Sequence, residues 1–323
     1  MTYSRITVAV LILLGIFFAL GPTVELDTTI QTRQLPDDLD RYLAESERQF
    51  PDITPGAEKT IVWADPEWRN DQPLALVYIH GFTATRQETA PVADLVAESL
   101  GANLVYTRLR GHGRSDDAMA EATVNGWIND AVEAVAIAEE IGDEVVVIAT
   151  STGAPLITWM AANGHLDEDV SAMVFLAPNF GPANMSTEIL LWPWGMQLTR
   201  LILGPYRETE PVSKEHAMYW TTRYPTEALL PMMGTVQLAR QSDLSLIEQP
   251  LLALYSEADT VISLPQMKRA FEEFGSTPKE LIAIETDDPG GHILAGAIRS
   301  PDTTEPVAQR IIEFLTTVLD IAE

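Results

Sequence analysis

Three residues of this chain, Ser151, Asp259 and His292, have the side-chain types needed for nucleophilic attack on a carbonyl group. A serine hydroxyl is a weak nucleophile until a base removes its proton, and an imidazole base works best when a carboxylate orients it. Each of the three residues follows a separate short apolar run that predicts a strand. Ligand sites of parallel sheets gather at the carboxyl ends of the strands, so we expect the three side chains to lie together.

The serine lies at the centre of the motif Ala-Thr-Ser-Thr-Gly, between the apolar run Glu144–Ile148 and the helix-compatible run Ala154–Ala162. A sharp turn from strand to helix exposes the Ser151 hydroxyl and presents backbone amides to a developing oxyanion. Such a turn needs small residues two positions before and two positions after the serine. Gly153 meets this need, whereas Ala149 stands where glycine is usual. The motif predicts a nucleophile at this turn.

The chain has five histidines, and one of them is favoured as the base. His292 lies in Gly-Gly-His-Ile, after the strand-like run Leu281–Ile284. A loop after the last strand can reach back to the serine turn; the alternative is a histidine of a surface loop. His165 and His216 carry no motif, and we expect them to be exposed or incidental.

Asp259 is the favoured partner of the imidazole. It lies in Ser-Glu-Ala-Asp, at the carboxyl end of the apolar run Leu251–Tyr255. Glu257, Asp287 and Asp288 are the alternatives. The last two are close to the histidine in sequence, but the loop would have to fold back for either to orient it.

The loop after the apolar run Leu74–Ile79 contains the motif Ile-His-Gly-Phe. We expect His80 to shape this loop by hydrogen bonding, so that the backbone amide of Phe82 points at an oxyanion together with the amide of Thr152. His112, in Arg-Gly-His-Gly-Arg-Ser, also follows a strand-like run and is expected to brace the same face.

These motifs, in this order and at this spacing, resemble those of α/β-hydrolases, and most of all the monoacylglycerol lipase and lysophospholipase-like branch. The resemblance covers the chain from about Thr60 to the C-terminus. It implies the roles of nucleophile for Ser151, acid for Asp259, base for His292, and oxyanion amides for Phe82 and Thr152. The family uses the chain order nucleophile, acid, base. Two departures are Ala149 and the lack of a second glycine in the loop after Ile-His-Gly.

The expected fold is that of an α/β-hydrolase: a mostly parallel sheet with helices on both faces and an inserted helical cap. Apolar strand-like runs alternate with helix-like runs from residue 60 onward, which is typical of such a sheet. Residues 179–243 break this rhythm, show no clear strand, and are predicted to form the cap. The predicted divisions are 1–24, a membrane anchor; 25–58, a tether with an amphipathic helix; and 59–323, the hydrolase domain.

The N-terminal residues are almost wholly apolar from Ile6 to Leu20, and no charge follows before Glu25. About 19 uncharged residues in a helix nearly match the hydrocarbon thickness of a bilayer. We therefore expect a transmembrane helix that anchors the catalytic domain on the non-cytoplasmic side, periplasmic or extracellular, since Arg5 precedes the run. The alternative is a signal peptide whose cleavage gives a secreted protein.

Composition excludes several classes of function. The chain has 47 acidic and 20 basic residues, a net charge of -27, so a nucleic-acid partner is not expected. It contains no cysteine, which excludes disulfides, thiolate metal sites and a cysteine nucleophile. We expect no cofactor and no metal.

Taken with the resemblance, these observations predict a serine hydrolase that cleaves carboxylic esters through an acyl-enzyme. Lipid-derived esters such as monoacylglycerol or lysophospholipid are the expected substrates, because the cap and the N-terminus are apolar. The alternatives are a thioesterase or a peptidase of the same fold, or a non-catalytic binding protein on this scaffold.

Overall fold

Seven strands form one central sheet in the order β1-β3-β2-β4-β5-β8-β9. Only β1 runs antiparallel to its neighbour, and the other pairs are parallel. The strands are β1 (Thr60–Val62), β2 (Leu74–Ile79), β3 (Asn103–Tyr106), β4 (Glu144–Thr150), β5 (Val170–Leu176), β8 (Leu251–Tyr255) and β9 (Lys279–Ala283). The structure is a computed structural model, and it describes residues 2–32, 34–67, 72–166 and 169–320.

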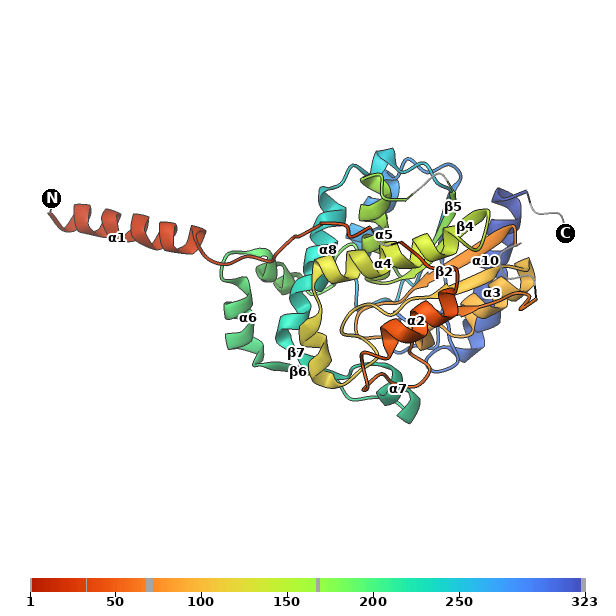
Figure 1. Cartoon of the computed structure of the whole chain (residues 1–323). Helices are drawn as coiled ribbons and strands as arrows, with labels where there is room; N and C mark the ends of the chain where they lie inside the picture. The colour runs from red at the N-terminus through yellow and green to blue at the C-terminus, as the bar shows by residue number, and fades with distance from the viewer. Residues whose placement is uncertain (1, 33, 68–71, 167–168, 321–323) are drawn as a thin grey trace.

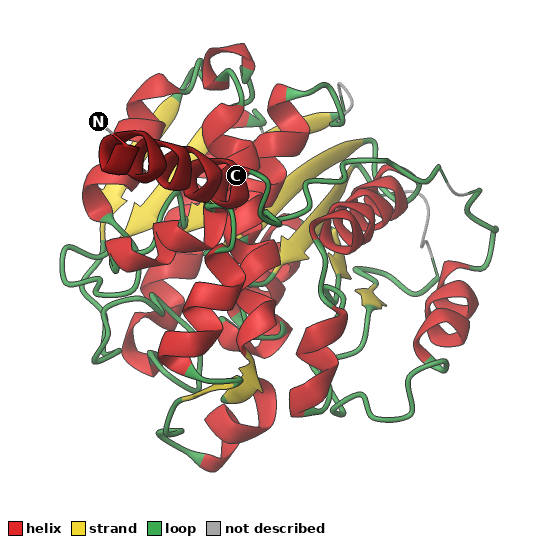
Figure 2. Cartoon of the chain, turned by 90° about the vertical axis from the view of Figure 1, so that its left-hand side faces the viewer, coloured by secondary structure: helices red, strands yellow, loops and turns green. Residues whose placement is uncertain are grey.

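Helices cover both faces of the sheet (Figures 1 and 2). One face carries α2 (Leu39–Glu47), α4 (Val124–Glu139), α5 (Gly153–Ala162), α8 (Leu229–Gln241) and α9 (Leu264–Glu273), and the other carries α3 (Val92–Leu100) and α10 (Thr304–Val318). Alternate strand residues point to opposite faces, so Val77 joins the first apolar layer while Leu76 and Tyr78 join the second. The prediction of a mostly parallel sheet wrapped by helices is confirmed.

The chain between β5 and β8, called the insertion below, lies over the end of the sheet that carries the serine turn. Its elements are α6 (Gly195–Leu203), β6 (Tyr206–Glu208), α7 (Lys214–Tyr219), β7 (Arg223–Pro225) and α8, with short 3-10 helices at Met185–Leu191, Thr226–Ala228 and Leu244–Leu246. β6 and β7 form a two-stranded antiparallel sheet. The expectation of no strand here was wrong, because strands of three residues are too short to give an alternating pattern. The boundaries 25–58, 59–323 and 179–243 stay predictions.

The N-terminal helix α1 (Thr2–Ala19) corrects the prediction of a transmembrane anchor at 1–24. Its 18 residues rise about 27 Å, and its unbroken apolar part begins only at Ile6, whereas a spanning helix needs about 20 apolar residues. Gly21 and Pro22, counted in the apolar run, lie beyond its end. No helix in the described ranges is long and apolar enough to cross a membrane. The predicted membrane-anchored location of the catalytic domain was therefore also wrong.

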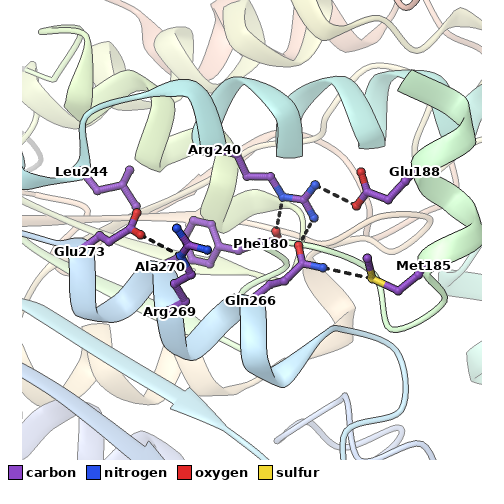
Figure 3. Close-up of a pocket in the computed structure, with 9 residues that line it drawn as sticks. All are labelled: Phe180, Met185, Glu188, Arg240, Leu244, Gln266, Arg269, Ala270 and Glu273. Atoms are coloured by element: carbon purple, nitrogen blue, oxygen red, sulfur yellow. Dashed lines mark hydrogen bonds and ion pairs between the residues drawn. The ribbon is translucent and has the colours of Figure 1, made fainter. Parts of the chain in front are cut away.

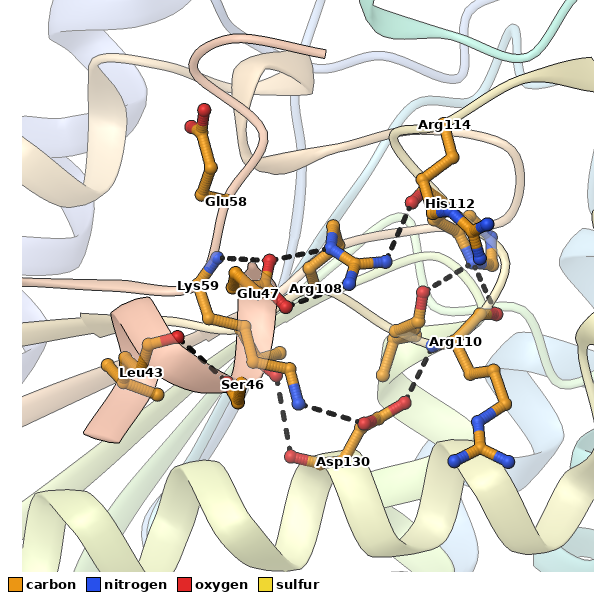
Figure 4. A network of polar contacts seen from close by, with 12 residues as sticks. Leu43, Ser46, Glu47, Glu58, Lys59, Arg108, Arg110, His112, Arg114 and Asp130 are labelled. Atoms are coloured by element: carbon orange, nitrogen blue, oxygen red, sulfur yellow. Dashed lines mark hydrogen bonds and ion pairs between the residues drawn. The ribbon is translucent and has the colours of Figure 1, made fainter. Parts of the chain in front are cut away.

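The helix expected between the tether and the sheet is present as α2. Asp38 caps it by accepting a hydrogen bond of 3.0 Å from the Arg41 amide. Leu39 and Leu43 are buried in the core, as the amphipathic pattern predicts. A polar network fixes the far end of the helix: the Glu47 carboxylate pairs with Arg108, which follows β3 (Figure 4).

Candidate active site

Ser151 sits in a strained turn between β4 and α5. Its φ is 49°, a left-handed conformation that is costly for a residue with a side chain and persists only where surrounding contacts hold it. Those contacts are a hydrogen bond of 2.8 Å from the Ser151 amide to the Leu176 carbonyl and one of 3.0 Å from the Asn179 amide to the Ser151 carbonyl. β5 and the start of the insertion thus hold the turn that carries the serine hydroxyl, and Ser151 is 6% exposed there.

The small residues around this turn are explained by backbone contacts. A Cβ at Gly153 would lie 2.7 Å from the Ile79 carbonyl oxygen, so only glycine fits there. Ala149 is fully buried in β4, between Ile79 of β2 and Phe175 of β5. The methyl group at this position is accommodated in the sheet.

The structure brings Ser151, Asp259 and His292 into one line of hydrogen bonds. Nε2 of His292 lies 2.9 Å from Oγ of Ser151, and Nδ1 lies 2.7 Å from Oδ2 of Asp259. Oδ1 of Asp259 accepts the amides of Val261 and Ile262 at 2.7 and 3.0 Å, which fixes the carboxylate. The arrangement suits a serine O–H that donates to the imidazole and an imidazole N–H that donates to the aspartate.

The three alternative carboxylates have other contacts. Glu257 is exposed and pairs with Lys268 at 2.7 Å. Asp287 accepts the Asp302 amide at 3.2 Å on the surface. Asp288 is buried close to the histidine but binds its backbone, not its ring.

Asp288 closes the loop that carries the imidazole. Its Oδ2 accepts the amides of His292 at 2.9 Å and Ile293 at 3.3 Å, and its Oδ1 pairs with Arg299. The Arg299 guanidinium in turn lies against the ring of His216 in α7. His216 is buried, contrary to the expectation that it is exposed or incidental, and it links the insertion to this loop.

The loop after β2 is held as the motif predicted. Nδ1 of His80 bonds the Gly81 carbonyl at 2.9 Å, and Nε2 accepts the Leu109 amide at 3.1 Å. Burial lowers the pKa of His80 to about 4, so the ring is neutral and able to make both bonds. A Cβ at Gly81 would lie 3.1 Å from the Cβ of Ser151, so the peptide that carries the Phe82 amide lies beside the serine.

His112 braces the same loop. Its ring lies 4.8 Å from that of His80 between centroids, and its Nδ1 is 3.2 Å from the Leu109 carbonyl oxygen. Burial lowers its pKa well below the usual value, so it is also neutral. The Phe82 ring packs edge-on against that of His112. It also packs edge-on against Tyr224 of the insertion, with 5.3 Å between the ring centroids. Thr152, the other predicted oxyanion donor, directly follows the serine and precedes the first residue of α5.

His165, the remaining histidine, is exposed, and its ring lies 5.0 Å from that of Trp159 in α5, between centroids. Within the described ranges, no group of three or more His, Asp or Glu side chains is arranged to hold a metal ion. The polar residues that sequence reasoning missed at this site are Glu88, Asp288 in its backbone role, and Asn179. Glu88 lies in a short 3-10 helix and the other two in loops, all without a motif, and nothing in a single sequence marks them as buried.

A separate cavity of about 510 Å³ lies between the 3-10 helix at Met185–Leu191, α8 and α9 (Figure 3). The guanidinium of Arg240, which lines this cavity, is already hydrogen-bonded within the protein. It donates to the Phe180 carbonyl at 2.7 Å and to Glu188 at 2.8 Å, and it contacts Gln266. None of the three hydrogen-bonded site residues lines this cavity. These contacts fasten the insertion to α9.

Comparisons with known proteins agree with this geometry. The chain is 24% identical over 225 residues to a thermostable monoacylglycerol lipase of Bacillus sp. (strain H-257), which covers 68% of this chain and 84% of that protein. Among solved structures it is similar to one of the metagenome-derived lipolytic enzymes LipS and LipT, with a TM-score of 0.67 and 20% identity over 82% of this chain and 99% of that one. It is also similar to a soluble variant of monoglyceride lipase from Saccharomyces cerevisiae, with a TM-score of 0.57 and 15% identity over 92% and 99% of the two chains.

The predicted resemblance to α/β-hydrolases of the monoacylglycerol lipase type is therefore confirmed. The model of one family matches residues 71–286, the greater part of the chain, which includes β2, the serine turn and Asp259. His292 lies six residues beyond the matched range. The chain belongs to the hydrolase family described as serine aminopeptidase, S33.

Proposed function

We propose that this protein is a serine hydrolase that cleaves carboxylic esters through an acyl-enzyme, and that its substrates are lipid-derived esters such as monoacylglycerol or lysophospholipid. The observation that carries the proposal is the continuous line of hydrogen bonds from Ser151 through His292 to Asp259. The Asp259 side chain is fully buried, and that of His292 is 10% exposed. An aspartate sheltered from water orients the imidazole and stabilises the charge that the ring acquires.

The reaction has two halves. His292 takes the proton of Ser151 as the hydroxyl oxygen attacks the ester carbonyl, and the amides of Phe82 and Thr152 donate to the oxyanion. His292 then gives that proton to the departing alcohol, which leaves an acyl group on the serine. Water, deprotonated by the same imidazole, attacks the acyl-enzyme, and the serine recovers its proton as the acid leaves.

Three features support a lipid-type ester. The aromatic side chain of Phe82 packs against Tyr224 of the insertion, next to the serine, and this gives the site an apolar wall. The insertion also exposes large apolar side chains, among them Leu201 and Ile202. Two of the similar proteins reported above are lipases named for monoacylglycerol or monoglyceride.

The proposal is tested with the full chain and a monoacylglycerol series of increasing acyl length. Replacing Ser151 by Ala is expected to remove about six orders of magnitude of kcat in the most favourable case, because the nucleophile is lost. The wild type is also expected to react with a fluorophosphonate probe, and the variant is not. A folded variant that hydrolyses esters at the wild-type rate contradicts the assignment. A folded wild type that does not label favours the binding-protein alternative.

The family description makes a peptidase the second candidate, and a thioesterase of the same fold is the third. A substrate panel with one acyl group presented as ester, thioester and amide separates the three. Preferred cleavage of the ester is expected. Preferred cleavage of the amide with a free α-amino group would instead favour the peptidase.

A further inference from the structure

Glu88 is a buried carboxylate that the reaction sequence above does not use. Its side chain is 1% exposed, in the short 3-10 helix Arg86–Glu88 that follows the loop containing Phe82. Among the described residues, none of its hydrogen-bonding partners is an arginine or a lysine. A carboxylate held in the interior without a cation is costly and needs an explanation.

The first contact of Glu88 is with the loop after β2. Its Oε1 accepts the Gly81 amide at 2.5 Å. The carbonyl group of Gly81 bonds the His80 ring, so both the amide and the carbonyl of Gly81 are fixed. The next amide along the chain is that of Phe82. Glu88 therefore helps to set the orientation of the peptide that is proposed to stabilise the oxyanion.

The second contact reaches the serine turn through one hydroxyl. Tyr78 of β2 donates its hydrogen to Oε1 of Glu88 at 3.0 Å. The same phenol oxygen lies 3.0 Å from the hydroxyl of Thr150, the residue before Ser151, and accepts the Thr89 hydroxyl at 2.7 Å. Because the tyrosine hydrogen is given to Glu88, the Thr150 hydroxyl donates to Tyr78. All four side chains are buried, so the chain of bonds is closed to water.

The third contact is with the loop that carries the imidazole. A Cβ at Gly296 would lie 2.5 Å from the Glu88 carbonyl oxygen, and the Ala297 amide bonds the Ala90 carbonyl at 2.9 Å. The segment around Glu88 thus touches the Phe82 loop, the serine turn and the stretch just after His292. No other carboxylate described at the site joins all three.

We propose that the Glu88 carboxylate is a positioning residue, which holds the Phe82 loop and the serine turn in register through the Gly81 amide and the Tyr78 hydroxyl, and whose negative charge strengthens both hydrogen bonds. This inference rests on the proposed function. Two titratable groups described in the structure interact with Glu88: Tyr78 of β2 by a hydrogen bond, and His292 of the loop after β9 through its charge. From the serine turn it meets Thr150 and Ser151, which carry no charge.

Electrostatics agree with this role. Burial raises the pKa of Glu88 to about 7, while its hydrogen bonds from Gly81 and Tyr78 and the charge of His292 lower it. The Glu88 carboxyl therefore changes charge in the pH range in which an imidazole base works.

The test is the Glu88→Gln variant, which keeps the shape of the side chain and one acceptor oxygen but carries no charge. Its kcat/KM for p-nitrophenyl butyrate is measured from pH 5.5 to 9 beside the wild type. We expect about a ten-fold loss at pH 9, where a charge-assisted bond becomes a neutral one, and nearly equal activities at pH 5.5, where Glu88 is itself protonated. A purely structural role would give the same loss at every pH.

Two further variants make the result specific. Glu98→Gln removes the charge of an exposed carboxylate in α3 and is expected to match the wild type across the pH range. Tyr78→Phe removes the link to Thr150 and is expected to lower kcat several-fold with the pH dependence of Glu88 retained. Thermal unfolding shows that each variant is folded.

The outcomes separate the two proposals. A wild-type to Glu88→Gln ratio that stays constant with pH, or shows no loss at pH 9, overturns the inference on Glu88 and leaves the ester hydrolase standing. A Ser151→Ala variant that keeps wild-type hydrolysis overturns both.

Discussion

Arg108 makes a two-pronged ion pair with Glu47: Nε donates to Oε2 at 2.7 Å, and Nη2 donates to Oε1 at 2.8 Å. The side chains are 3% and 8% exposed. The pair joins α2 to the loop after β3, where Arg108 also donates to the His112 carbonyl at 3.2 Å (Figure 4). The segment before the sheet is thereby attached to the residues that brace the Phe82 loop.

Replacing Glu47 by Gln is expected to lower the free energy of unfolding by about 3–5 kcal/mol, because it leaves a buried guanidinium without its counter-charge. Urea unfolding at neutral pH measures the change. Glu45→Gln is the matched control: Glu45 pairs with Arg41 on the same helix, with side chains 50% and 73% exposed, so a change within about 0.5 kcal/mol is expected. Equal effects of the two substitutions would contradict this account.

The sequence was informative where burial follows from apolar runs. β2 and β8 have the predicted bounds, because their side chains are buried on both faces and their sequences are continuous apolar runs. Ser151, Asp259 and His292 followed from their places after such runs. α9 was not predicted, since its only buried residues, Met267 and Ala270, form a narrow apolar face.

Polar residues in the interior were beyond sequence reasoning. Glu88 ends a short 3-10 helix and Asp288 lies in a loop, both places where a carboxylate is normally exposed, and only the packed structure buries them. The apolar run at the N-terminus led to the wrong prediction of a transmembrane helix. The count of uncharged residues included Gly21 and Pro22, which end a helix rather than extend it.

Asp288→Asn is expected to lower kcat by about ten-fold with little change in KM, because a charged acceptor of the His292 and Ile293 amides becomes a neutral one. The substitution also unpairs Arg299. Steady-state kinetics with one ester separate the two parameters. Asp287→Asn, next to it on the surface, is the control and is expected to act as the wild type. A loss shared by both variants would show that the loop tolerates no change of charge, and the backbone role of Asp288 would be wrong.

Gly153→Ala is expected to remove most of the activity and about 1–3 kcal/mol of stability, because the new Cβ would meet the Ile79 carbonyl oxygen at 2.7 Å and push α5 from the sheet. Ala149→Gly tests the other small residue of the turn. It deletes a buried methyl group from β4, so we expect no gain in activity and a loss of about 1 kcal/mol. Ester hydrolysis and urea unfolding measure both. An Ala149→Gly variant faster than the wild type would mean that the alanine impairs the turn.

Glu88 also makes stability depend on pH in a direction that can be measured. Its pKa in the folded protein is about 7, above the ordinary value of 4.5 that it regains on unfolding. The folded state therefore holds more protons between these values, and stability falls as pH rises through 7. The penalty at pH 8.5 is of order 3 kcal/mol, from 1.4 kcal/mol per pKa unit.

The glutamine of the Glu88→Gln variant cannot ionise, so the variant does not carry this penalty. The difference in free energy of unfolding, variant minus wild type, is therefore expected to rise between pH 5.5 and pH 8.5. Urea unfolding of both proteins at the two pH values gives the difference, in which the other titrating groups cancel. A difference that is unchanged or reversed would mean that Glu88 keeps its ordinary pKa in the folded state. In that case the charge of Glu88 would be constant over the working range, and a catalytic effect of the substitution would have to come from geometry alone.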